Sequence, residues 1–129
     1  MDHNKKLLVV DDEPHIRRVI EIKFKSRGYQ VYIAKNGEEG LKKIHAIKPD
    51  IVIMDVNMPR LDGKSVCEKT DHLKEETPFL TIIMTCHISS IDQEWIDQRV
   101  DTVFVEKPFS PSRLLDHVQE YEVRVGNGR

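Results

Sequence analysis

Acidic side chains stand directly after two apolar runs in the sequence. Asp11 and Asp12 follow residues 7–10, and Asp55 follows residues 51–54. A short apolar run bounded by turn residues predicts a strand buried on both faces, so each carboxylate would stand where a strand opens into a loop. Two carboxylates about 5 Å apart repel by roughly 3 kcal/mol at an effective dielectric constant of about 20. Such a group requires retained protons or a bound cation, and its hard oxygen ligands favour Mg²⁺ or Mn²⁺ over zinc.

A hydroxyl and an ammonium group complete the set. Thr85 follows the apolar run at residues 79–84, and Lys107 comes shortly after the apolar run at residues 103–105. A carboxylate nucleophile beside a hard cation, a lysine and a hydroxyl suits phosphoryl transfer, because that reaction needs mainly positioning and charge neutralisation. Each residue alone also has an ordinary explanation: Asp11 and Asp12 can stabilise the start of a helix, and Thr85 can favour a strand end. The chemistry therefore depends on whether the fold brings these residues together.

Strands and helices alternate along the chain. Apolar or alternating runs predict five strands, over residues 7–10, 29–34, 50–55, 79–84 and 103–105. Helical spacing predicts five helices, beginning at Pro14, after Asn36, at Lys64, near Ile88 and after Ser110, with the third over residues 64–73. This order predicts an α/β fold of the flavodoxin-like (βα)5 type, a doubly wound parallel sheet in the order 2-1-3-4-5 with helices on both faces. Strands 1 and 3 meet at its switch point, which would gather the three aspartates.

Local signals mark several of the expected element ends. Asn36 can cap the second helix through its side chain, and Ser110 can cap the last one. Gly28 suits the end of the first helix. The pair Asp62-Gly63 predicts a turn in which Gly63 adopts an unusual backbone dihedral. These signals define where the loops that carry the polar residues begin.

Length and composition bound the class of protein. The 129 residues carry a net charge of −2, and 39% are hydrophobic and 33% charged. These values predict one globular domain over residues 1–129, with a core at about 6–122 and a flexible tail or linker start at 123–129. The charge excludes a general basic surface for nucleic acid or anionic membranes. No apolar run resembles a membrane span or signal peptide, and Cys67 and Cys86 lack metal-ligand spacing, so we expect a cytoplasmic protein with free thiols.

Four segments in order carry a family resemblance. They are Leu-Leu-Val-Val-Asp-Asp-Glu at 7–13, Asp-Ile-Val-Ile-Met-Asp-Val-Asn-Met-Pro-Arg-Leu-Asp-Gly at 50–63, Ile-Ile-Met-Thr at 82–85 and Lys-Pro-Phe at 107–109. From about Lys6 to Tyr121, the chain resembles the CheY-like receiver domain of two-component response regulators. The resemblance implies a signalling switch in a phosphorelay rather than an enzyme that turns over a separate substrate.

The resemblance implies a role for each polar residue. Asp55 would accept a phosphoryl group from a phosphohistidine of a sensor histidine kinase or a histidine phosphotransfer protein. Asp12 and Asp55 would bind Mg²⁺ through their side chains, Asn57 through its main-chain carbonyl and Asp11 through water. Lys107 would pair first with Asp55 and then with a phosphoryl oxygen.

The resemblance also implies how the signal would spread. The Thr85 hydroxyl would move to the phosphoryl group, and Phe104 stands at the position of an aromatic residue that turns inward. His87 and Asn57 would border the site and tune the attack of water on the acyl phosphate. The shifted surface of helix 4, strand 5 and helix 5 would control a downstream partner that the sequence does not identify. The domain would be a monomer or a phosphorylation-dependent homodimer and would not itself contact nucleic acid.

Two positions depart from the family pattern. Cys86 stands where a small Ala or Gly usually follows the switch threonine, which would narrow access to the phosphoryl group. Val100 and Asp101 stand where the family usually has a Gly-Ala pair, so the family pattern does not determine the path of the chain between helix 4 and strand 5. The peptide bond between Lys107 and Pro108 would be cis, as is usual in the family. None of these features touches the acidic residues.

Two other functions fit parts of the pattern. A Mg²⁺-dependent phosphatase with an aspartyl nucleophile would use similar chemistry, but its usual Asp-x-Asp motif is absent at Asp55-Val56-Asn57. A flavin-binding electron carrier would place phosphate after the first strand, where residues 11–14 read Asp-Asp-Glu-Pro and repel it. Phosphorylation of Asp55, sustained phosphoester hydrolysis or a coloured purified protein would distinguish the three.

Overall fold

A parallel sheet of five strands forms the centre of the molecule. The computed structural model describes residues 5–127. The strands are β1 (Lys6–Val10), β2 (Gln30–Ala34), β3 (Ile51–Asp55), β4 (Leu80–Thr85) and β5 (Thr102–Glu106). They pair in the order β2-β1-β3-β4-β5, which confirms the predicted flavodoxin-like topology. Because β1 and β3 are neighbours, the residues that follow them emerge side by side at one edge.

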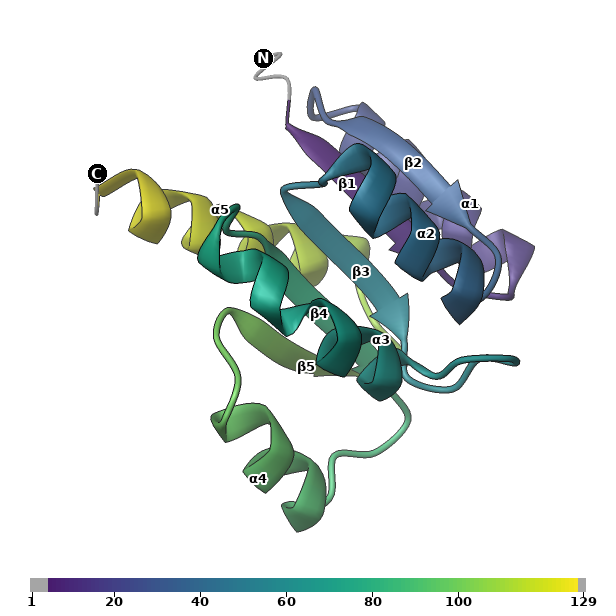
Figure 1. The fold of residues 1–129 in the computed structure, drawn as a ribbon. Coiled ribbons are helices and arrows are strands. Elements are labelled where there is room, and N and C mark those ends of the chain that lie inside the picture. Colours follow the sequence, from purple (N-terminus) through teal and green to yellow (C-terminus); the bar gives the residue numbers. More distant parts are fainter. Residues whose placement is uncertain (1–4, 128–129) are drawn as a thin grey trace.

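Helices cover both faces of this sheet (Figure 1). They are α1 (Pro14–Lys25), α2 (Gly37–Ile47), α3 (Gly63–Thr70), α4 (Ser90–Asp97) and α5 (Pro111–Asn127), and α3 continues as the 3-10 helix η1 (Asp71–Glu75). Successive strand residues point to opposite faces. Leu7 and Val9 accordingly pack in a core with α1 and α5, whereas Leu8 and Val10 pack in a second core with α2 and α3. The central strands are thus held from both sides.

The third and fourth helices differ from the sequence prediction. The third, expected over residues 64–73, is α-helical to Thr70 and then tightens into η1, which carries the buried side chain of Lys74. The fourth begins at Ser90 rather than near Ile88, because Ser89 forms a capping box there. Ile91, one of the apolar residues whose spacing suggests this helix, is 72% exposed. Apolar spacing therefore indicated this helix but not the face that it buries.

The last helix is longer than expected. α5 continues to Asn127, so residues 123–127, which were expected to form a flexible tail or the start of a linker, are helical. Val125 lies on the same side of the helix as the buried Val118 and Tyr121 and packs against the same core. Apolar contact therefore extends the helix past the expected core limit at residue 122.

Side chains cap the helices at two predicted positions and at two further ones. Asn36 caps α2 by accepting a hydrogen bond from the main-chain N–H of Glu39 at 2.9 Å. Ser110 accepts one at 3.4 Å from the main-chain N–H three residues later. Asp62 caps α3, and Ser89 caps α4. Each cap satisfies a main-chain donor that the helix itself leaves unpaired.

Gly63 is required for a different reason from the one expected. Among the described residues, the glycine with a positive φ is Gly28, at 90°. Gly63 begins α3, and a Cβ atom on it would lie 2.7 Å from the main-chain oxygen of Asp55. The close approach of α3 to the end of β3 therefore selects glycine here, not an unusual dihedral.

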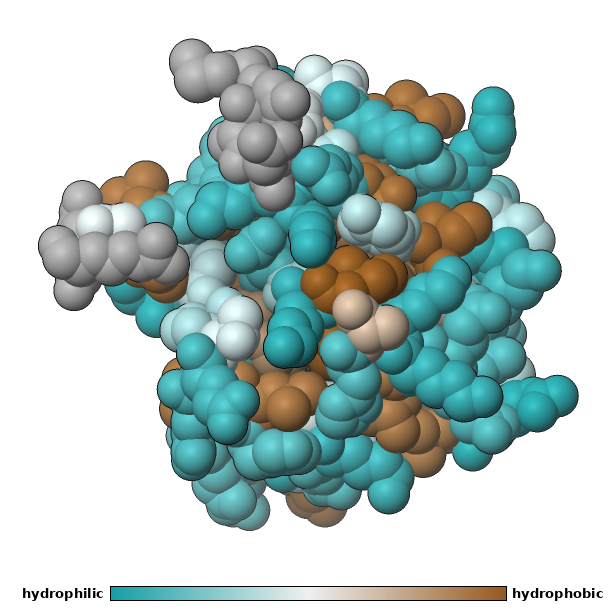
Figure 2. Space-filling view, turned by 45° about the horizontal axis from the view of Figure 1, so that its top comes forward, coloured by the Kyte–Doolittle hydropathy of each residue, from teal (hydrophilic) through white to brown (hydrophobic). Residues whose placement is uncertain are grey.

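Hydrophilic residues dominate the face drawn in Figure 2, and hydrophobic residues form small separate groups on it. The large exposed apolar side chains are spread over three helices and the turn before β5: Val19 and Ile22 on α1, Ile91 on α4, Val123 on α5 and Val100 in the turn. Scattered apolar residues of this kind are ordinary on protein surfaces. In residues 5–127, no helix has the length and apolar character needed to cross a membrane.

We predict that Gly63→Ala lowers the free energy of unfolding by about 1–3 kcal/mol. The new methyl group would meet the main chain of Asp55 and Val56, which cannot move aside as a flexible side chain would. Urea unfolding followed by circular dichroism measures the change. Gly126→Ala is the matched control, because a Cβ atom there has no neighbour within 4 Å. Equal stability of Gly63→Ala and wild type would contradict the packing argument.

Candidate functional site

Three aspartates meet at the carboxyl edge of the sheet. Asp55 is the last residue of β3, and Asp11 and Asp12 follow β1 directly. One carboxylate oxygen of each lies within 4.8 Å of those of the other two. Asp11 and Asp55 are buried, whereas Asp12 is exposed. The structure therefore brings together the acids that the sequence placed at two strand ends, and the group opens to solvent on one side.

Lys107 and a main-chain amide bind the carboxylate of Asp55. The Nζ atom of Lys107 lies 3.1 Å from Oδ2 of Asp55, and the N–H of Asn57 donates to Oδ1 at 3.3 Å. Burial lowers the pKa of Lys107, but the hydrogen bond and charge of Asp55, together with the charge of Asp11, outweigh burial and raise it above its usual value. Lys107 therefore stays protonated and neutralises one carboxylate. The Lys107–Pro108 peptide bond is cis, as the resemblance implied.

The carboxylate of Asp11 is only half satisfied. Its Oδ1 accepts a hydrogen bond from the main-chain N–H of Glu13 at 2.9 Å, whereas its buried Oδ2 has no hydrogen-bond partner among the described residues. Burial raises the pKa of Asp11 to about 6; the bond from Glu13 opposes this rise, and the charge of Asp55 adds to it. A buried oxygen without a partner, in a group of three carboxylates, fits a hard divalent cation such as Mg²⁺.

Thr85 is bound to its own loop. Its hydroxyl donates a hydrogen bond to the main-chain oxygen of His87 at 3.2 Å and accepts one from the N–H of His87 at 3.4 Å. Its main-chain oxygen accepts a bond from the N–H of Lys107 at 2.7 Å. A movement of the hydroxyl toward the aspartates would therefore break its contacts with the loop that leads into α4.

The other predicted residues lie around the rim and on β5. Asn57 and His87 are exposed. Cys86 is also exposed, so its side chain extends to solvent rather than into the buried part of the site. Phe104 is half-buried, and its ring centroid lies 6.0 Å from that of Trp95 on α4, at an interplanar angle of 39°. Phe104 thus connects β5 with the helix that follows Thr85.

A row of polar contacts attaches α4 to α3 and η1, and we call it the α3–α4 ladder. Its contacts, in order, are Lys64–Asp92, Glu68–Trp95, Glu68–Arg99 and Asp71–Arg99. The indole N–H of Trp95 donates to Glu68 at 3.0 Å, and the guanidinium of Arg99 lies 4.0 Å from the Trp95 ring centroid. Sequence reasoning missed this ladder, because its partners are far apart in the chain.

Lys74 stabilises the turn in which the sequence departs from the family pattern. Its buried ammonium group donates to the main-chain oxygens of Val100 at 2.8 Å and Asp101 at 2.9 Å and to the Thr102 hydroxyl at 3.0 Å. Burial lowers the pKa of Lys74 to about 8. Asp101 takes a positive φ of 49° in this turn. The buried ammonium group of Lys74 thus fixes the path between α4 and β5.

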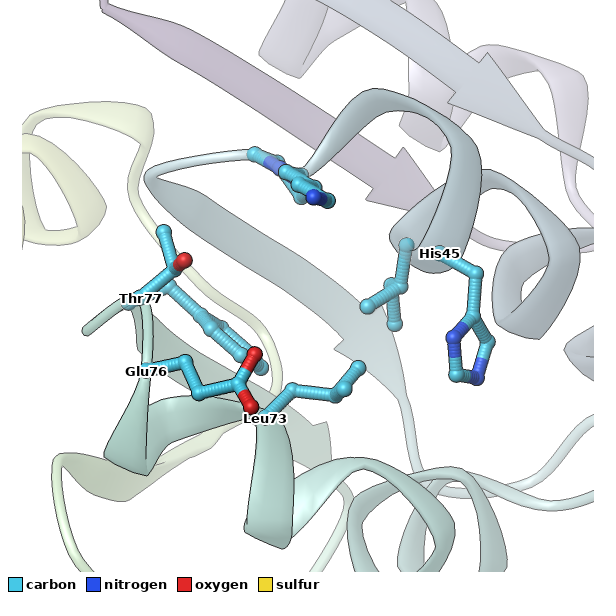
Figure 3. Close-up of a pocket in the computed structure, with 8 residues that line it drawn as sticks. His45, Leu73, Glu76 and Thr77 are labelled. Atoms are coloured by element: carbon cyan, nitrogen blue, oxygen red, sulfur yellow. The ribbon is translucent and has the colours of Figure 1, made fainter.

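A separate pocket lies at the other end of the sheet (Figure 3). Its volume is about 60 Å³, and apolar side chains of Ile44, Leu73 and Phe79 line it together with His45 and Glu76 near its rim. These residues lie near the starts of β3 and β4, whereas the aspartates follow the ends of β1 and β3. The pocket shares no residue with the aspartate cluster and does not extend the candidate site.

Comparison with known proteins agrees with this geometry. The family model described as the response regulator receiver domain matches residues 7–119. The chain belongs to this family. Receiver domains are parts of two-component signalling systems, which agrees with the resemblance that the motifs carry.

Relatives of this receiver domain are longer proteins. The alkaline phosphatase synthesis transcriptional regulatory protein PhoP of Bacillus subtilis is 38% identical over 116 residues, which are 90% of this chain and 48% of PhoP. A probable transcriptional regulator, ycf27 of Cyanophora paradoxa, is 36% identical over 126 residues, which are 97% of this chain and 51% of that protein. The chain therefore spans about half the length of these curated relatives.

Solved structures of other receiver domains have the same fold. A CheY-like receiver domain protein from Methanospirillum hungatei JF-1 superposes with a TM-score of 0.87 at 25% identity, covering 98% of this chain and 99% of its own. The Vibrio cholerae chemotaxis protein CheY4 gives a TM-score of 0.81 at 28% identity, covering 91% and 98%. The likeness extends over nearly the whole chain.

We predict that Asp11→Asn stabilises the receiver domain in EDTA at about pH 8 and has little effect at about pH 3.5. The pKa of Asp11 is raised from 3.8 to about 6 on folding, so its contribution to stability is fully present below the unfolded pKa of 3.8 and is lost as the pH rises from there through about 6. The gain at the higher pH should be about 1–3 kcal/mol. Urea unfolding at both pH values measures it, with the exposed Asp116→Asn as the control. A gain of equal size at both pH values would exclude this explanation.

We predict that Glu68→Gln loosens α4 from α3. The amide can still accept the bond from Trp95, but the attraction to Arg99 is lost, which is worth up to about 1 kcal/mol for a pair whose carboxylate stays open to solvent. Hydrogen exchange of α4 amides should accelerate by up to about fivefold at low salt. The difference should shrink at about 1 M salt, where screening weakens the wild-type pair. Glu94→Gln, on the exposed side of α4, removes the same charge and should leave the exchange rates as in wild type.

Proposed function

We propose that the protein is a phosphorylation-controlled switch in which Asp55 accepts the phosphoryl group. The observation that supports this most strongly is the position of Asp55, 3.1 Å from the ammonium group of Lys107 and within 4.8 Å of carboxylate oxygens of Asp11 and Asp12. A nucleophilic carboxylate, a neutralising cation and hard oxygen ligands are the groups that aspartyl phosphotransfer needs. The donor is a phosphohistidine of a sensor histidine kinase or of a histidine phosphotransfer protein.

The proposed reaction exchanges one phosphorus bond for another. A carboxylate oxygen of Asp55 attacks phosphorus; the P–O bond forms as the P–N bond breaks, and the imidazole leaves with that electron pair and takes a proton from solvent. Lys107 then transfers its hydrogen bond from Asp55 to a phosphoryl oxygen. Mg²⁺, held by Asp11, Asp12, Asp55 and the main-chain carbonyl of Asn57, would neutralise charge on the phosphoryl oxygens when bound.

Thr85 links the proposed reaction to the surface. Its hydroxyl makes neutral hydrogen bonds to the main chain of His87. A neutral bond contributes about 0.5–1.5 kcal/mol and a bond to a charged group about 1.5–3 kcal/mol. Because phosphorylation adds about 1.5–2 negative charges, it is favourable for the Thr85 hydroxyl to exchange its hydrogen bonds with His87 for one to a phosphoryl oxygen. The exchange frees the loop before α4 and lets Phe104 turn inward, which changes the surface of α4, β5 and α5.

Partners follow from this two-state behaviour. A downstream protein that binds the changed surface more tightly shifts the equilibrium toward the active state. The exposed residues Asn57 and His87 border Asp55 and set the rate at which water removes the phosphoryl group. The relatives PhoP and ycf27 are transcriptional regulators of about twice the length of this chain. In such proteins the segment that acts on transcription would lie in the half that this chain does not match. The receiver domain itself acts as a monomer or a phosphorylation-dependent homodimer.

Incubation with Mg²⁺ and acetyl phosphate tests the proposal. We expect intact-mass spectrometry to show a gain of one phosphoryl group in wild type and none in Asp55→Asn or in EDTA. Asp116→Asn, which removes an exposed acid far from β3 in the sequence, should be phosphorylated like wild type. The same gain in wild type and Asp55→Asn would refute Asp55 as the acceptor.

A further inference from the structure

An arginine outside the aspartate cluster holds the loop that carries Asp11 and Asp12. Arg17, the fourth residue of α1, donates a hydrogen bond from Nη1 to the main-chain oxygen of Asp11 at 2.8 Å. That oxygen belongs to the peptide group that joins Asp11 to Asp12. Because the guanidinium is charged, its hydrogen bond is stronger than that of a neutral donor and fixes the plane of this peptide.

Hydrogen bonds hold Asp11 from β2, from the loop after β1 and from α1. Its main-chain N–H donates to the oxygen of Ala34 on β2 at 3.2 Å, and its Oδ1 accepts the bond from Glu13 at 2.9 Å. These two bonds orient Asp11 itself. The bond from Arg17 instead acts on the peptide that leads to Asp12, whose side chain is exposed. The direction in which Asp12 projects therefore depends on Arg17 through the main chain.

We infer that Arg17 is a positioning residue for the divalent cation at the aspartate cluster. It contacts no carboxylate in the cluster through this bond, but it orients the peptide between two of the three acids. Groups that orient metal ligands typically account for about 10- to 100-fold in metal affinity. The inference rests on the proposed binding of Mg²⁺ by these acids and does not depend on phosphorylation of Asp55.

Magnesium affinity of the unphosphorylated protein tests this role. We expect Arg17→Met to raise the Kd for Mg²⁺ about tenfold, measured by isothermal titration calorimetry at fixed ionic strength. Arg17→Lys keeps the charge and one donor and should recover part of the affinity. The melting temperature of each variant in EDTA shows whether the fold is affected. A merely structural role would lower the melting temperature and leave the Kd of the folded protein unchanged.

Arg18→Met is the matched control. It removes the same charge from the next residue of α1, which is exposed, so its Kd should stay within about twofold of the wild-type value. Equal losses of affinity in both Met variants would show a general charge effect and overturn the positioning role. Wild-type affinity in Arg17→Met would overturn it as well. If Arg17→Met does not fold, Arg17→Lys compared with Arg18→Lys decides by the same criterion.

The result can be separated from that of the phosphorylation experiment. Wild-type protein that binds Mg²⁺ but gains no phosphoryl group would contradict phosphotransfer to Asp55 and leave the measurement on Arg17 valid. Wild-type protein that binds no Mg²⁺ would overturn the role of Arg17 together with the cation site.

Discussion

Mutual repulsion among three carboxylates is the constraint on which the rest of the structure depends. At about 5 Å and an effective dielectric constant of about 20, each charged pair is unfavourable by roughly 3 kcal/mol. Lys107 neutralises Asp55. Asp11 keeps a buried oxygen that has no hydrogen-bond partner within residues 5–127, and its pKa is raised chiefly by burial and further by the charge of Asp55. A flexible frame would relieve the repulsion by letting the carboxylates separate. The sheet must therefore be rigid at this edge.

Two cores on opposite faces of the sheet supply this rigidity. Leu7 and Val9 of β1 pack with α1 and α5, and Leu8 and Val10 pack with α2 and α3. Residues of β3 alternate in the same way and are buried along the whole strand. Each large apolar side chain contributes about 1.5–3 kcal/mol when buried, so a shift of either strand would disturb both cores at once. Apolar burial thus holds Asp11 and Asp55 together against their repulsion.

The sheet and the aspartate cluster could be predicted because their signals are local. Apolar runs closed by acidic residues place Asp11 and Asp55 at strand ends, and parallel topology then makes them neighbours. Contacts between distant segments leave no such signal: Glu68 binds Trp95 across 27 residues, and Lys74 binds Val100 across 26. The role of Gly63 was misjudged for the same reason, because the main-chain oxygen that it approaches belongs to another element.

The helix α4 is attached by a different kind of force from the helices α1 and α5. The buried residue of α4 is Ile96. The α3–α4 ladder and the contact of Trp95 with Phe104 also attach this helix to the rest of the domain. The ion pairs of the ladder stay partly open to solvent, and such pairs contribute about 0–1 kcal/mol each. The buried apolar residues of α1 and α5 contribute about 1.5–3 kcal/mol each. An exchange of hydrogen bonds at Thr85 is worth about 1 kcal/mol. That amount is enough to alter the attachment of α4, but it is too small to move helices that are held by apolar packing.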